Sequence, residues 1–111
     1  MNKYRIIVTD HALQAMTEIR DYISFELSNP SAARKHLEAF RTEIRKQLTT
    51  MPDKFHPISE EPWGSEGVRK FSVKSYYIYY WIKEESLTVY VTDVLYAGSN
   101  QKKRLAGMPM E

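Results

Sequence analysis

The 111-residue sequence predicts a single α+β domain, in which a small antiparallel β-sheet of about four strands carries an N-terminal two-helix hairpin on one face. Two amphipathic stretches near the N-terminus place apolar residues three or four positions apart, the spacing of a helix with one buried face. Between residues 67 and 96, three runs are rich in aromatic and β-branched residues, which favour strands. Because neither helix can bury its apolar stripe alone, the hairpin should cover the sheet.

The N-terminal half is predicted to form one strand and two helices. Residues 4–8 form the strand, and Thr9 and Asp10 then offer side-chain oxygens that can cap the first helix. Asn29 and Pro30 begin a second helix over residues 30–49, with Asn29 as its N-cap and Pro30 in its first position. A link this short requires the two helices to be antiparallel. The apolar stripes consist of Ala12, Met16, Ile19, Ile23 and Leu27 in the first helix, and of Ala33, Leu37, Phe40, Ile44 and Leu48 in the second.

Three further strands are predicted over residues 67–73, 76–82 and 87–96, which gives the order β-α-α-β-β-β. The middle run has large side chains at both odd and even positions, as in a central strand covered on both faces, or covered on one and lined with tyrosines on the other. Residues 52–66 contain three prolines and should form an ordered loop. We expect one domain over residues 1–105, with a short helix or frayed end after the last strand, and a flexible tail over residues 106–111.

Composition excludes several classes of function. The chain has 16 basic and 14 acidic side chains, so its bulk charge does not indicate a nucleic-acid-binding protein. Without cysteine it has neither disulfides nor thiolate chemistry. The three histidines are far apart in sequence, and no phosphate-binding or dinucleotide-binding motif is present, so we expect neither a metal nor another cofactor. The longest apolar run, residues 76–82, is too short to span a bilayer, and we expect a cytoplasmic protein.

Four fragments in this order resemble the RelE/ParE toxin superfamily: residues 27–33 (LSNPSAA), 67–69 (GVR), 77–80 (YIYY) and 91–96 (VTDVLY). Together with the rest of the pattern, the resemblance covers roughly residues 4 to 100. It implies a small bacterial toxin of a type II toxin–antitoxin system, of the kind associated with plasmid stabilization, that is held silent by a cognate antitoxin.

The two main branches of the superfamily imply different functions. RelE-like members are similar to ribosome-dependent messenger-RNA endonucleases, whereas ParE-like members inhibit DNA gyrase. Metal-free RNA cleavage needs a base, an acid and cations on the transition state. The candidates for these roles are Arg69, Lys70, Lys74 and Tyr96.

The sequence favours the ParE-like branch and therefore a gyrase inhibitor over an enzyme. Tyr77 stands where the ribonuclease branch tends to place an arginine, and residues 97–99 (AGS) stand where it places another. The fragments at 67–69 and 94–96 fit the ParE-like branch better. Ser99 and Asn100 replace its usual His-Asp or Arg-Asp pair, which leaves a degenerate, non-toxic antitoxin-binding module as a third hypothesis.

Seven residues are candidates for contact with a partner, whether antitoxin, gyrase or a ribosome with its mRNA: Arg69, Tyr77, Tyr79, Tyr96, Lys102, Lys103 and Arg104. Each has a structural alternative. Arg69 could pair with Glu38 or Glu43 on the hairpin. The tyrosines could pack on the sheet with their hydroxyls in water, and the basic run could be a solvated chain end.

Overall fold

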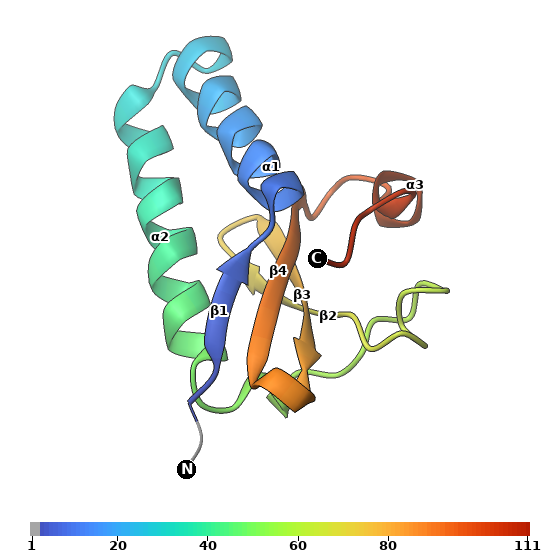
Figure 1. The fold of residues 1–111 in the computed structure, drawn as a ribbon. Coiled ribbons are helices and arrows are strands. Elements are labelled where there is room, and N and C mark those ends of the chain that lie inside the picture. The colour runs from blue at the N-terminus through green and yellow to red at the C-terminus, as the bar shows by residue number, and fades with distance from the viewer. Residues whose placement is uncertain (1–2) are drawn as a thin grey trace.

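The computed structural model describes residues 3–111, and Figure 1 shows a helical hairpin beside a four-stranded sheet. The α+β class, the element order and the hairpin on one face are confirmed. The helices are α1 (Asp10–Asp21), α2 (Pro30–Leu48) and α3 (Gln101–Leu105), and the strands are β1 (Arg5–Val8), β2 (Arg69–Val73), β3 (Tyr76–Lys83) and β4 (Thr88–Tyr96).

The strands lie in the order β1-β4-β3-β2, and the sheet is mixed instead of fully antiparallel. The β2–β3 and β3–β4 pairs are antiparallel as expected, whereas β1 runs parallel to β4, with Ile6 opposite Val89. The topology explains this difference. The chain rises through β1 and α1 and returns through α2, so β2 starts at the same end of the sheet as β1 (Figure 1). Two hairpin reversals then give β4 the direction of β2.

Both helix starts follow the local sequence as predicted. The side chain of Thr9 accepts a hydrogen bond from the Ala12 N–H at 3.2 Å, and that of Asn29 accepts one from the Ala32 N–H at 3.1 Å. Pro30 occupies the first turn of α2. The end of α1 differs from a plain helix, because residues Tyr22–Glu26 form a π-helical turn, η1. This turn keeps Ile23 in the core at the tip of the hairpin.

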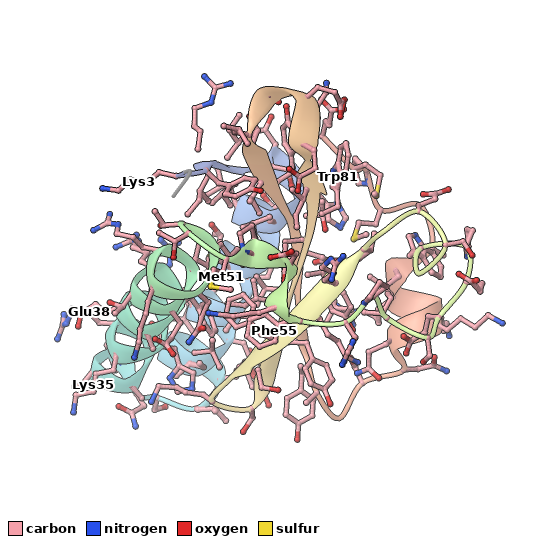
Figure 2. The ribbon with its side chains drawn as sticks, turned by 90° about the horizontal axis from the view of Figure 1, so that it is seen from below. Lys3, Lys35, Glu38, Met51, Phe55 and Trp81 are labelled. Carbon is pink, nitrogen blue, oxygen red and sulfur yellow. The ribbon has the colours of Figure 1, made fainter. Side chains whose placement is uncertain are left out.

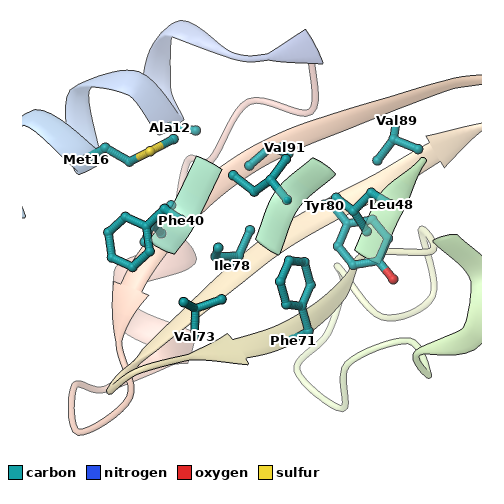
Figure 3. Close-up of a cluster of buried hydrophobic side chains, with 12 residues drawn as sticks. Ala12, Met16, Phe40, Leu48, Phe71, Val73, Ile78, Tyr80, Val89 and Val91 are labelled. Carbon is teal, nitrogen blue, oxygen red and sulfur yellow. The ribbon is translucent and has the colours of Figure 1, made fainter. Parts of the chain in front are cut away.

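The main core lies between the hairpin and one face of the sheet. Figure 3 shows Phe40 and Leu48 of α2 facing Ile78, Tyr80 and other strand residues. The rings of Phe71 and Tyr80 meet edge to face with centroids 6.0 Å apart. Packing of this kind stabilises a domain through the apolar area removed from water and through close contact between the rings.

A second, smaller core covers the opposite face of the sheet. Its buried members come from the loop after α2, from the strands and from the C-terminal segment: Ile58, Val68, Tyr79, Leu95, Leu105 and Met108. Because β3 contributes buried residues to both cores, the observed arrangement is the first of the two predicted for it, a central strand covered on both faces.

Side chains of the C-terminal segment contact this second face, and the flexibility that the sequence predicts for residues 106–111 stays a prediction. Met108 is buried, and the indole N–H of Trp81 donates a hydrogen bond to the backbone carbonyl of Met110. Lys83 Nζ lies 3.8 Å from a carboxylate oxygen of Glu111. Leu105 and Met108, on either side of Gly107, both belong to the second core.

Candidate partner-binding grooves

Arg69, the first candidate from the sequence, holds a loop in place. Its guanidinium donates hydrogen bonds to the backbone carbonyls of Asp53, at 3.1 Å, and Phe55. It forms no ion pair with the hairpin acids considered above; Glu38 points away from the sheet on the outer side of α2 (Figure 2). The hydroxyl of Tyr80 supports the same loop by donating to the carbonyl of Pro52 at 2.5 Å. Arg69 is therefore engaged within the chain.

Lys70, Tyr77 and Tyr79 form a layered group on the second face of the sheet. The Nζ of Lys70 lies 4.0 Å from the ring centroid of Tyr77 and 5.9 Å from that of Tyr79. Tyr79 is 0% exposed, and its hydroxyl has no hydrogen-bond partner among the described residues. Burial raises the pKa of Tyr79, and the neighbouring Glu60 carboxylate raises it further. A fully buried tyrosine cannot contact a partner in this arrangement, whereas Tyr77 remains partly accessible.

Lys74 and Tyr96 lie together at the end of the sheet opposite to Arg69. Tyr96 is 56% exposed and its ring meets that of Tyr76 edge to face at 5.9 Å. The Ala97 N–H donates to the carbonyl of Ser75, in the β2–β3 turn that also contains Lys74. Since Arg69 is five residues from Lys74 along the strand, roughly 16 Å separate them. The four residues considered for RNA cleavage do not converge.

The basic run at residues 102–104 lies on α3, which packs at the end of β4. The side-chain amide of Gln101 donates to the carbonyls of Tyr96, at 3.2 Å, and Ala97, at 3.0 Å. Lys102, Lys103 and Arg104 are all exposed. These hydrogen bonds hold α3, and with it the basic run, close to Tyr96.

A pair that the sequence does not indicate joins the exposed His11 to the buried Asp93. Nε2 of His11 lies 3.2 Å from Oδ2 of Asp93, which is 2% exposed. The other carboxylate oxygen accepts the Val94 N–H at 2.8 Å. Burial raises the pKa of Asp93, while the imidazole and the Val94 N–H act in the opposite direction. The one signal in the sequence is a charged residue within the apolar run of β4.

One surface groove lies between α1, α2 and β1 and has a volume of about 440 Å³. Its floor is apolar and includes Ile6, Val8, Leu13, Met16, Leu37 and Ile44. The charged side chains that line it are Arg20, Arg41 and Arg45, of which Arg20 also pairs with Asp21 at 3.0 Å. We call it the arginine groove. An apolar floor between arginines suits an amphipathic segment with acidic residues along its flanks.

The second groove, of about 950 Å³, lies on the other side of α1, between the tip of the hairpin and the ends of β3 and β4. We call it the tyrosine groove, after its lining residues Tyr22, Tyr76 and Tyr96. Glu18, Asp93 and Arg104 also line it, so its charges are mixed. The two grooves share no lining residue, and successive faces of α1 form a wall of each.

Within residues 3–111, no three histidine, aspartate or glutamate side chains come together as metal ligands would. None of the described helices is long and apolar enough to cross a membrane.

Comparison with known proteins gives one family. The family model described as the ParE toxin of type II toxin–antitoxin system, parDE, matches residues 6–100. A search of curated protein sequences gives no match.

Solved structures share the fold at low sequence identity. The chromosomal ParDE system of P. aeruginosa aligns with a TM-score of 0.68 and 16% identity, over 84% of this chain and 95% of that one. The RelBE2 toxin–antitoxin complex of Mycobacterium tuberculosis gives 0.59 and 18%, over 85% and 98%. A doubly substituted free form of the E. coli toxin RelE gives 0.55 and 16%, over 92% of both chains.

Proposed function

Because the chain belongs to the ParE toxin family of type II toxin–antitoxin systems, we propose that it acts in the cytoplasm by inhibiting DNA gyrase through protein contact. In this proposal a cognate antitoxin neutralises the toxin, and the toxin does not cleave RNA. The family places the chain among toxins with an antitoxin partner; the choice of gyrase as the target is the step that needs a test.

The observation that carries the proposal is the separation of the residues that RNA cleavage would need. Cleavage requires a base, an acid and cations within reach of one phosphate. Arg69 is engaged with two backbone carbonyls at one end of β2, whereas Lys74 and Tyr96 lie at the other end. Between them, the second face of the sheet is covered by the loop after α2 and by the C-terminal segment. This arrangement favours contact with a protein over chemistry on RNA.

The arginine groove is the surface that best fits the antitoxin. An acidic amphipathic segment would place apolar side chains on Ile6, Val8 and Met16 and its carboxylates beside Arg41 and Arg45. Arginine suits this role because its planar guanidinium can donate two parallel hydrogen bonds to one carboxylate. Burial of the apolar floor would supply most of the binding energy and the arginines would select the partner.

The experiment that tests the proposal is gyrase-dependent cleavage of plasmid DNA with ATP and the purified toxin. We expect linear DNA trapped by gyrase to accumulate with toxin concentration, and to disappear when the antitoxin is added or gyrase is left out. No cleavage at a large molar excess of toxin would overturn the proposal. Cleavage of mRNA on ribosomes, measured in parallel, would then identify the ribonuclease alternative, and the absence of both activities a non-toxic binding module.

A further inference from the structure

Exposed apolar side chains are concentrated around the tyrosine groove. Among residues 3–111, six large hydrophobic side chains are exposed, and four of them belong to this region: Tyr22, Phe25, Leu27 and Tyr96. Tyr22, Leu27 and Tyr96 line the groove, and Phe25 lies in the same π-helical turn as Tyr22. Contiguous exposed apolar residues with tyrosine and phenylalanine among them are typical of protein interfaces.

The π-helical turn η1 is what presents this surface at the tip of the hairpin. Ile23 is buried and fixes the turn to the core, while Phe25, two residues later, is 75% exposed. The Asn29 N–H donates to the carbonyl of Ile23 at 3.1 Å, which ties the turn to the start of α2. Single π-helical turns occur often at functional sites. The exposed ring is therefore held on a backbone that is anchored on both sides.

The two grooves differ in the charge of their lining residues, so they should accept different partners. The three charged residues that line the arginine groove are all positive, which suits the acidic antitoxin segment proposed above. The tyrosine groove has two acidic lining residues, Glu18 of α1 and Asp93 of β4, and one basic lining residue, Arg104 of α3. An acidic segment would meet repulsion from Glu18 there. A segment of low net charge, with apolar side chains between one basic and one acidic residue, fits both walls.

We propose that the tyrosine groove and Phe25 form the surface that contacts gyrase, and that the antitoxin occupies the arginine groove on the other side of α1. This inference rests on the proposed function, because it assigns a surface to the same target. It predicts that target binding and antitoxin binding can be lost separately.

The first test removes the exposed aromatic groups at the tip of the hairpin. Phe25→Ser combined with Tyr22→Ser should raise by about tenfold or more the toxin concentration that gives half-maximal trapped linear DNA, as expected for aromatic interface residues. Antitoxin affinity, measured by calorimetry, should stay within about twofold. Met51→Ser is the matched control, because Met51 is also exposed but lines neither groove, at the far end of α2 (Figure 2). This control should leave both readouts unchanged.

The reciprocal test reverses charge in the arginine groove. Arg41→Glu with Arg45→Glu should weaken antitoxin binding by about tenfold or more, because carboxylates of the two proteins would then face each other. Gyrase trapping by this variant should match that of the wild type. Circular dichroism and thermal unfolding of every variant show whether the fold is retained, so that loss of binding is not confused with loss of structure.

Each other outcome has a definite meaning. If wild-type toxin traps no gyrase cleavage complex, the proposed function fails and the surface assignment fails with it. If the wild type traps DNA and the Tyr22/Phe25 variant traps it equally well, only the surface assignment is overturned. It is also overturned if the Tyr22/Phe25 variant loses the antitoxin, or if sedimentation shows that these residues hold two copies of the toxin together.

Discussion

The imidazole of His11 and the carboxylate of Asp93 lie 3.2 Å apart, although 82 residues separate them in the chain. The pair joins the first turn of α1 to the buried part of β4, at one wall of the tyrosine groove. His11 is exposed and Asp93 is buried. The pair therefore connects the ionisation state of a buried carboxylate with the pH of the solvent.

Stability should respond to pH through Asp93. Its pKa is raised above the value of about 3.9 expected in an unfolded chain, so the folded state holds the proton more tightly. The contribution of Asp93 to stability is therefore fully present below that value and is lost as pH rises through the folded pKa. Relative to Asp93→Asn, the wild type should lose free energy of unfolding as pH rises above about 4, as measured by urea denaturation. A difference between the two proteins that is the same at every pH would contradict this account.

His11→Ala should raise the pKa of Asp93 further, because the imidazole is among the groups that lower it. The carboxyl carbon of Asp93, followed by NMR across the same pH range, should then titrate at higher pH than in the wild type. An unchanged titration would mean that the Val94 N–H and Arg104 support the carboxylate without the imidazole.

Tyr80→Phe should destabilise the fold by about 1–2 kcal/mol, because it leaves the carbonyl of Pro52 without its hydrogen-bond donor in a buried setting. Tyr77→Phe is the matched control on the same strand, since that ring is partly exposed, and should change stability by less than about 0.5 kcal/mol. Chemical denaturation measures both. Equal losses from the two substitutions would show that the hydroxyl of Tyr80 does not anchor the loop.

Phe40→Ala should cost about 3–5 kcal/mol, because the ring is fully buried in the main core and meets Tyr76 edge to face at 5.5 Å. Phe25→Ala, in the same hairpin, should cost less than about 0.5 kcal/mol, since its ring is mostly in solvent. Comparison of the two variants thus distinguishes a phenylalanine that packs in the core from one that lies at the surface. A large loss of stability from Phe25→Ala would mean that its ring packs in the fold and is not free for a partner.

Deletion of residues 108–111 should destabilise the protein and expose the indole of Trp81, because Met108 leaves the second core and the carbonyl of Met110 is lost as an acceptor. In a Trp63→Phe background, fluorescence reports Trp81 alone, since the chain has two tryptophans. We expect a red-shifted emission after the deletion. Emission and unfolding midpoint that both stay constant would agree with the flexible tail predicted from the sequence.

The features that the sequence predicts well are local ones. Thr9, Asn29 and Pro30 act on backbone groups within a few residues, so the starts of both helices could be predicted from short fragments. The partners of Arg69 could not, because they are backbone carbonyls 14 and 16 residues away, which no pattern of side chains identifies. The same holds for the direction of β1, whose partner strand comes at the other end of the chain.

Tyr79 illustrates how the assignment of a face can fail. Both faces of β3 carry large side chains, so the sequence does not distinguish a tyrosine that contacts a partner from one that lies in a second core. The cover over Tyr79 comes from residues 58–68 and from the C-terminal segment, two parts of the chain without a clear strand or long-helix pattern. The register shift between Tyr79 and Tyr80 is likewise set by pairing with β4 and leaves no mark in composition.

The parallel pairing of β1 has a consequence for synthesis of the protein on the ribosome. In the described sheet, β4 is the sole strand neighbour of β1. Arg5 pairs with Thr88, so the pairing can form only after residue 88 has been synthesised. Closing so long a loop carries an entropic cost and makes this step dependent on a distant contact. Ile6 and Val8, which form part of the arginine groove, are thus fixed in place only when nearly the whole chain has been made. A partner that binds this groove therefore recognises the complete, folded toxin and not the nascent chain.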